Sequence, residues 1–211
     1  MAGHADYGLE RITAFSDGIF AVAITLLVLS IAVPDLGNAP TDANLRGRLL
    51  DTIPSIVGFV ISFAVVGVFW LSHHRLFQVV REYDRATQYA NLLFLLTICF
   101  VPFPTAVIAH YGQLATAVNF YAASMAFAGL TLALLWWVAA IRPAHRKAQR
   151  RTGHLFAIRA IGTAVIFLIS IPIALIDVSA ARYAWLAILP LFVIIGRLYR
   201  ADGSEEARSS A

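Results

Sequence analysis

The sequence predicts an all-α, polytopic membrane protein with six transmembrane helices and both termini in the cytoplasm. Hydrophobic residues make up 60% of the 211 residues and charged residues 13%, whereas soluble domains carry about 25% charged residues. The mean hydropathy is +0.76. Between Arg85 and Arg142 the chain contains no Asp, Glu, Lys or Arg. This composition excludes an ordinary soluble domain.

The apolar residues divide into runs close to the ~20 residues that cross ~30 Å of hydrocarbon at 1.5 Å per residue. The charge-free run is too long for one crossing and divides at residues 110–113, while Pro102 and Pro104 predict a kink or an end late in its first half. Turn-forming residues predict a loop over 34–48. We expect one membrane domain over residues 1–200 and a polar tail over 201–211. The six expected spans cover about residues 12–33, 49–71, 88–109, 114–141, 156–176 and 180–198.

The charges between the spans predict the orientation. Segment 73–85 carries three arginines, and segment 142–159 carries six basic residues and no acid. Because basic residues favour the cytoplasmic side, these segments and both termini are expected there. The sequence pI of about 9.6 therefore reflects membrane asymmetry, with contact between segment 142–151 and anionic lipid, and indicates no nucleic-acid partner. We expect a multi-pass protein of the cell membrane.

The first span begins with polar residues. Ionisable groups at the mouth of a membrane span are costly and mark a pathway or a specific partner. Asp17 lies six residues after Arg11, too far for a direct pair between adjacent turns, so each is expected to bond outside the first helix. Candidate partners of Asp17 at the same membrane side are Trp70, His73 and His74. Ordinary anchoring at the interface remains the alternative.

Other polar residues give weaker signals. His73 and His74 are adjacent and point about 100° apart on a helix, so they do not chelate a metal together. Asn91 stands alone in an apolar run and is interpreted as an interfacial group or a helix–helix contact. The single cysteine, Cys99, excludes a disulfide framework. We expect no metal site and no cofactor.

An apolar stripe runs along the first span. Val22, Leu26 and Leu29 lie within about 60° of one another at ~100° per residue. The stripe is open to two interpretations: a lipid-facing or packed surface, or the lining of a pore.

Small residues at two pairs of positions, Ala14 with Gly18 and Ala21 with Thr25, allow another helix to approach closely. This spacing favours a packed first helix over a lipid-exposed one. The Thr25 hydroxyl either faces a pore or bonds back to the Ala21 carbonyl, and its spacing favours the second.

Several motifs are absent. The chain has no carbonyl selectivity filter, no nucleophile elbow, no zinc-protease motif and no P-loop. The sequence therefore predicts no enzyme.

The combination of Arg11, Phe15, Ser16 and Asp17, followed by the run from Ala21 to Leu27, resembles the signature of the transmembrane protein 175 family. These are potassium channels with bacterial members and an endosomal–lysosomal animal member. The stretches from Phe69 to His74 and from Phe100 to Thr105 resemble that family too. The resemblance extends over all six expected helices.

The resemblance implies a six-helix subunit that assembles around a central pore lined by the first helix. It implies an apolar constriction at Val22, further rings at Leu26 and Leu29, and a hydroxyl layer at Thr25. The family often has a larger aliphatic residue at the first ring, so Val22 is a departure. The resemblance also implies a network that holds the first helix in place, made of Arg11, Phe15, Ser16, Asp17, Trp70, His73 and His74.

Since the chain has one copy of the motif, a four-helix pore requires a homotetramer. The expected activity is a modestly K⁺-selective monovalent cation channel, because K⁺ holds its water less tightly than Na⁺ does. The alternative is a secondary transporter that is coupled to protons through Asp17 and the histidines, although such proteins usually show paired halves.

Overall fold

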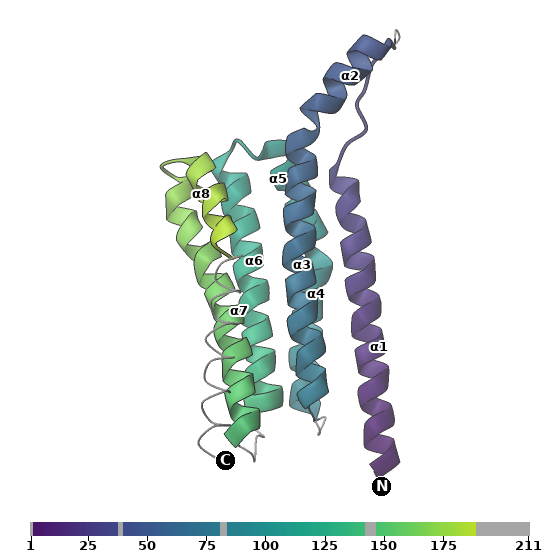
Figure 1. Ribbon diagram of the computed structural model, residues 1–211, viewed down its shortest axis with the longest axis vertical. Helices are drawn as coiled ribbons and strands as arrows, with labels where there is room; N and C mark the ends of the chain where they lie inside the picture. Colours follow the sequence, from purple (N-terminus) through teal and green to yellow (C-terminus); the bar gives the residue numbers. More distant parts are fainter. Residues whose placement is uncertain (1, 38–39, 81–83, 142–146, 189–211) are drawn as a thin grey trace, which may run out of the picture.

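The computed structural model describes residues 2–37, 40–80, 84–141 and 147–188, and all regular structure in these residues is helical. Figure 1 shows the long helices side by side. In chain order the elements are α1 (Ala2–Leu26), η1 (Leu27–Ser30), α2 (Asp42–Asp51), α3 (Ile53–Val79), α4 (Arg85–Phe100), α5 (Pro102–Tyr111), α6 (Ala115–Trp136), η2 (Trp137–Ile141), α7 (Lys147–Ala174), α8 (Val178–Ala184) and η3 (Trp185–Ala187).

Five helical segments of the described chain are long and apolar enough to cross a membrane: Gly8–Ser30, Ile53–Val79, Arg85–Tyr111, Ala115–Ala140 and His154–Ala174. The expected all-α membrane fold is confirmed. The expected sixth span begins with α8 and η3, and its remainder over 189–198 lies outside the described residues, as does the tail over 201–211.

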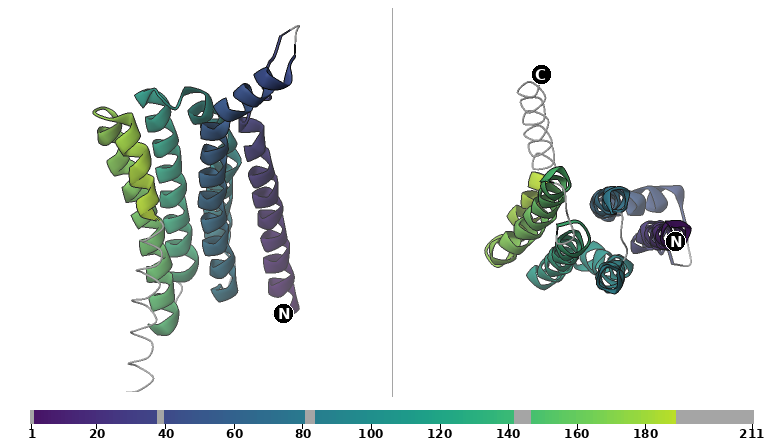
Figure 2. Two further views of the ribbon diagram at one scale, coloured as in Figure 1. Left: turned by 45° about the horizontal axis from the view of Figure 1, so that its top comes forward. Right: turned by 90° about the horizontal axis from the view of Figure 1, so that it is seen from below.

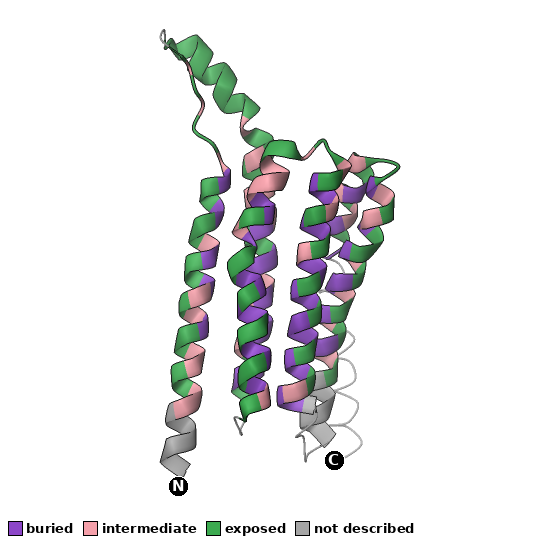
Figure 3. Ribbon diagram, turned by 180° about the vertical axis from the view of Figure 1, so that it is seen from behind, coloured by how far each residue is buried: buried purple, intermediate pink, exposed green. Residues whose placement is uncertain are grey.

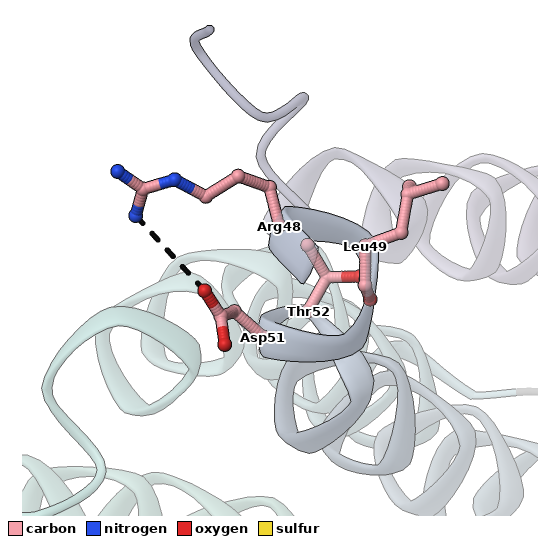
Figure 4. A network of polar contacts seen from close by, with 4 residues as sticks. All are labelled: Arg48, Leu49, Asp51 and Thr52. Atoms are coloured by element: carbon pink, nitrogen blue, oxygen red, sulfur yellow. Dashed lines mark hydrogen bonds and ion pairs between the residues drawn. The ribbon is translucent and has the colours of Figure 1, made fainter. Parts of the chain in front are cut away.

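The segment expected as a loop over 34–48 is partly helical, so that prediction was wrong. Thr41 caps α2 by accepting a hydrogen bond from the Asn44 amide at 3.2 Å, and Asp42 lies in the first turn, where its charge favours the helix dipole. The helix ends at an exposed Arg48–Asp51 contact of 4.0 Å, beside the Thr52 hydroxyl, which bonds the Leu49 carbonyl at 2.7 Å (Figure 4).

Two spans extend beyond their expected limits. Helix α3 continues to Val79 instead of ending near residue 71, so His73, His74 and Arg75 lie within the helix. Helix α7 begins at Lys147 and not near residue 156. Hydropathy detects only the part of a helix that matches the hydrocarbon, whereas the backbone hydrogen bonds continue through its polar ends.

The third expected span breaks at Val101, between α4 and α5, as the two prolines predicted. Pro102 has no N–H, so it begins the second helix at a position where none is needed. The Thr105 hydroxyl bonds the Val101 carbonyl at 2.9 Å and supplies a partner for a carbonyl at the break. The fourth span follows its expected bounds and ends in the short π-helix η2.

The most extensive helix pair is α6 with α7. Gly129 lets these helices approach closely, because a Cβ atom there would lie 2.9 Å from the Ala160 carbonyl oxygen. Helix α1 packs on α3 and α4 and stands at the edge of the bundle, farthest from α7 (Figure 2). One whole side of α1 therefore has no partner among the described residues of its own chain.

Candidate functional site

Helix α1 and its continuation η1 have two distinct faces. Ser16, Phe20, Ala23, Leu27 and Ser30 recur every three or four residues and are all buried. This spacing places them on one side of the helix, against α3 and α4. The opposite side is exposed along its length (Figure 3).

Asp17 is bound to α3 by a single strong contact. The indole nitrogen Nε1 of Trp70 donates a hydrogen bond to Asp17 Oδ1 at 2.8 Å. Trp70 is one of the three partners that the sequence suggested. The Trp70 ring is itself held by stacking on His74, with 5.3 Å between ring centroids and 24° between planes. His74 also contacts Gln78, with 3.0 Å between Nε2 atoms.

A second chain of hydrogen bonds, which is buried, joins α1, α3 and α4. It involves Ser16 and His73, the residues next to Asp17 and His74 in the sequence. Nε2 of His73 donates to Oδ1 of Asn91 at 2.8 Å, and Nδ2 of Asn91 donates to the Ser16 hydroxyl at 3.2 Å. All three residues are at most 2% exposed. Buried polar groups require partners, and here α1, α3 and α4 supply them to Ser16, Asn91 and Nε2 of His73, whereas Nδ1 of His73 has no hydrogen-bond partner among the described residues.

Asn91 is the member of this site that the sequence left isolated. An Asn in a long apolar run is a signal for a helix–helix contact. Its partners depend on how α4 sits between α1 and α3, which no spacing within one helix can supply.

Aromatic rings pack around the His73 side chain of this hydrogen-bond chain. Phe20 of α1 lies 5.6 Å from His73 and 5.9 Å from Phe94, centroid to centroid. The His73 ring stacks on Phe94 at 5.7 Å and contacts Phe77 at 4.7 Å. Phe20 and Phe94 are almost fully buried. Apolar packing thus surrounds the polar contacts and excludes water from them, which strengthens hydrogen bonds.

Phe15 and Arg11, two other residues of the expected network, lie on the exposed surface of α1. Phe15 is 53% exposed, so its ring points away from the bundle. Arg11 is also exposed. His73 and His74 bond different neighbours, and no group of three potential metal-binding side chains occurs among the described residues.

The apolar stripe lies on the exposed face. Val22 is 58%, Leu26 42% and Leu29 73% exposed. The Thr25 hydroxyl bonds back to its own helix at 2.8 Å, to the Val22 carbonyl and not to that of Ala21 as expected. A groove of ≈ 430 Å³ follows this face from Ala14 to Leu26.

The continuation of α1, η1, is packed against another helix of the bundle. Helix α5 packs against η1. The buried Thr105 hydroxyl of α5 also contacts the Ser62 hydroxyl at 3.2 Å, and Ser62 contacts the Tyr121 hydroxyl at 3.0 Å. The break at Val101 thus lets α5 pack against η1. The hydroxyl contacts through Ser62 connect α5 to α3 and α6 at the same time.

Comparisons with known proteins identify relatives of this chain. The family "Endosomal/lysosomal potassium channel TMEM175" matches residues 11–102. A potassium channel of Streptomyces collinus is 41% identical over 152 residues, which cover 69% of this chain and 66% of that protein. A potassium channel of Chamaesiphon minutus is 44% identical over 129 residues, covering 60% and 63%. The matches thus span about two thirds of the length of these curated relatives.

A solved structure matches over most of the chain. The crystal structure of a lysosomal potassium-selective channel TMEM175 homolog from Chamaesiphon minutus superposes with a TM-score of 0.78 at 33% identity. The superposition covers 90% of this chain and 98% of that one. Sequence and fold agree over nearly the whole length, and the chain belongs to the TMEM175 family of channels.

Proposed function

We propose that this multi-pass membrane protein is the subunit of a homotetrameric, modestly K⁺-selective cation channel of the cell membrane. Four copies of α1 surround the pore. Val22, Leu26 and Leu29, here called the apolar neck, form its constrictions, with the Thr25 hydroxyls between the first two rings. The contacts around Asp17 and Ser16 hold α1 against its own subunit.

The observation that carries this proposal is the two-faced character of α1. One face is tied to α3 and α4 by the Trp70–Asp17 and Asn91–Ser16 hydrogen bonds. These bonds set the rotation of α1 about its own axis, so the apolar neck points away from the bundle. A helix that only anchored the chain in lipid would need no such orientation.

The exposed face of α1 also differs in composition from a lipid-facing helix. Its exposed residues include Ala14, Gly18, Ala21 and Thr25. The exposed face of α7 instead presents large aliphatic side chains, namely Ile158, Ile161, Val165, Leu168 and Ile169. Small residues let neighbouring helices approach, whereas large aliphatic residues pack well with acyl chains. Helix α1 is therefore the better candidate for contact with other subunits.

The mechanism follows from the dimensions of the neck. Val22 and Leu26 are separated by about 6 Å along the axis. Leu26 is the last residue of α1, and Leu29 lies in the 3₁₀-helix η1. Because a 3₁₀-helix rises ~2 Å per residue, these two rings lie about 6 Å apart along the axis, whereas an α-helix would separate them by about 4.5 Å. Successive apolar rings exclude water when the neck is narrow, so conduction stops by dewetting.

Selectivity in such a neck arises from dehydration. Aliphatic rings offer no carbonyl oxygens to replace the water that an ion loses. K⁺ gives up part of its hydration shell more readily than Na⁺, so K⁺ crosses with the smaller penalty. Because no ligand set discriminates by size, the expected preference is modest.

Polar substitution of the neck tests the proposal. Leu26→Asn adds a group that holds water, so conductance should rise or K⁺ preference should fall in single-channel recordings from planar bilayers. Val22→Asn and Leu29→Asn should act in the same direction. The matched control is Leu168→Asn on α7, because Leu168 is 45% and Leu26 42% exposed.

The outcomes separate the alternatives. Three neck variants that conduct like the wild type, or a control with the same effect as Leu26→Asn, would refute the assignment of the pore. Flux that saturates at low turnover without unitary currents would favour the secondary transporter instead.

A further inference from the structure

A pocket lies between α3 and α8, at the end of the bundle from which α2 projects (Figure 1). We call it the α3–α8 pocket. Its volume of ≈ 430 Å³ is within the ≈ 300–1,000 Å³ of small-molecule sites. One wall follows α3 from Ile53 to Ser62, two residues that are about 13 Å apart along the helix axis. The pocket therefore reaches from the surface end of α3 into its apolar span.

The deep end of the pocket is preformed. Tyr121 of α6 is fully buried, and its ring packs on Trp185 with 4.9 Å between centroids. The indole nitrogen of Trp185 donates to the Ser170 hydroxyl of α7 at 2.9 Å, which fixes the ring. The hydroxyl groups of Tyr121 and Ser62 contact each other at 3.0 Å. An apolar ligand would therefore leave neither hydroxyl without a partner.

The wall formed by α3 is apolar and contains a glycine. A Cβ atom added to Gly58 would meet no atom within 4 Å, so the space in front of this residue belongs to the pocket. Val57 of α3 and Leu186 of η3 also line the pocket and are 51% and 50% exposed, so it is open at the surface. Apolar cavities hold water poorly and take up apolar molecules. In a membrane, hydrocarbon chains are the apolar molecules at hand.

A cation borders the pocket at its surface end. Nη1 of Arg182 in α8 lies 3.7 Å from the position of a Cβ added to Gly112, so the guanidinium group is beside the turn between α5 and α6. Nη2 of Arg182 contacts the Ser179 hydroxyl at 3.5 Å. A guanidinium group has five N–H donors, and this contact uses one of them. Donors therefore remain for a ligand at the mouth of the pocket.

The mouth lies at the level of the lipid head groups. The turn beside Arg182 separates the apolar segments Arg85–Tyr111 and Ala115–Ala140. Tyr183, which follows Arg182 and also lines the pocket, is 72% exposed, and tyrosine is enriched where membrane helices meet the head groups. Phosphate oxygens accept strong hydrogen bonds from guanidinium groups. The pocket thus has the polarity of a phospholipid, with a cation at the head-group level and apolar walls toward the bilayer interior.

We propose that the α3–α8 pocket binds one acyl chain of a membrane phospholipid, whose phosphate is held by Arg182. The chain enters past Val57 and Leu186, lies against Gly58 and ends near the contact between Ser62 and Tyr121. The lipid belongs to the leaflet opposite the one at which α1 begins. This site lies apart from the apolar neck and does not depend on the proposed pore.

Photo-cross-linking tests the site in the full-length protein. The protein is reconstituted into phosphatidylcholine vesicles that contain a small fraction of phosphatidylglycerol with a diazirine in the middle of one acyl chain. After irradiation, adducts are mapped by peptide mass spectrometry. We expect adducts on residues 53–62 and 183–186, enriched over those at Leu168. Leu168 is exposed on α7 and reports ordinary contact with lipid.

Filling the pocket should remove its ligand. Gly58→Leu places a side chain in the open space and should abolish the adducts on residues 183–186, while those at Leu168 remain. The matched control is Gly67→Leu on the same helix. A Cβ added to Gly67 also meets no atom within 4 Å, but Gly67 does not line the pocket. Melting temperatures verify that both variants fold.

Removing the cation tests the head-group contact and leaves the cavity intact. Arg182→Gln should reduce the pocket adducts about fivefold, the contribution expected of one arginine near a membrane surface. Arg46→Gln removes the same charge from α2 at the same end of the bundle, and Arg46 is exposed and outside the pocket. This control should change the adducts less than twofold.

Four results would overturn the proposal. Adducts without enrichment over Leu168 would exclude a defined site, and equal losses for Gly58→Leu and Gly67→Leu would show that filling the pocket is not the cause. Equal labelling of the pocket by a diazirine diacylglycerol, which has no phosphate, would exclude the contact with Arg182. Stronger labelling by a free fatty acid with the same chain would exclude a phospholipid as the occupant. None of these results bears on channel activity, which is measured separately by the neck variants.

Discussion

At the scale of single residues, the orientation of α1 depends on a few polar atoms within an apolar setting. Asp17 is partly buried and receives the Trp70 indole hydrogen at 2.8 Å. Deleting one partner of such a contact leaves the other without compensation, which costs more than the hydrogen bond itself contributes. Trp70 is therefore expected to matter through its nitrogen as much as through its ring.

Trp70→Phe tests this expectation. The substitution keeps an aromatic ring beside His74 but leaves Asp17 Oδ1 without its donor, which should reduce stability by about 1–3 kcal/mol. Thermal unfolding in detergent, followed by circular dichroism, should show a lower melting temperature than for the wild type. Trp137→Phe is the control, because Trp137 is 53% exposed. Equal melting temperatures for both variants would contradict the role given to Trp70.

At the scale of helices, close approach between α6 and α7 forms the rigid part of the subunit. Gly129 permits it, because the nearest atoms to an added Cβ are the Ala160 carbonyl oxygen at 2.9 Å and the Ala164 Cβ at 3.1 Å. Backbone atoms cannot move aside as a flexible side chain can. The α6–α7 pair then provides a surface against which the neighbouring helices pack.

Gly129→Ala should force these two helices apart and destabilise the protein by about 1–3 kcal/mol, the usual cost of overpacking. Gly67→Ala in α3 is the matched control, because no atom lies within 4 Å of a Cβ added there. That control should be neutral or stabilising, since alanine favours a helix by up to about 1 kcal/mol over glycine. A Gly129→Ala protein as stable as the control in chemical denaturation would show that the helices adjust without strain.

At the scale of the whole molecule, α1 lies at the edge of the bundle, so the proposed pore requires further copies of the chain. The neck residues are 42–73% exposed in one subunit. Apolar exposure is ordinary in a membrane, so it does not by itself identify an interface. Only a symmetric assembly would turn one apolar stripe into a closed ring.

Cross-linking tests this assembly. In a Cys99→Ala background, which removes the single natural cysteine, Leu26→Cys should form disulfide-linked dimers under mild oxidation, because identical residues meet around an axis. Leu168→Cys on α7 should remain monomeric on denaturing gels. Native mass spectrometry should give an assembly with four times the mass of the 23.0 kDa chain. A tetramer that cross-links through Leu168→Cys and not through Leu26→Cys would place another surface at the axis.

Much of the architecture could be predicted from local patterns. The lengths of the apolar runs located the five spans of the described residues, and Pro102 and Pro104 located the break at Val101. The short helix α2 was missed because its residues read as turn formers, although Thr41 and Asp42 provide a strong helix start. The polar continuations of α3 and α7 were missed because hydropathy does not report helical hydrogen bonding outside the hydrocarbon.

The sequence by itself determined that the chain crosses a membrane, that an apolar stripe follows its first helix, and that Asp17 needs a partner outside that helix. These properties follow from composition and from the 3.6-residue period, which are local. The tertiary structure decided which groups meet: Trp70 with Asp17, Asn91 between His73 and Ser16, and Tyr121 with Ser62. Such contacts join helices distant in sequence, and their geometry depends on how the whole bundle packs.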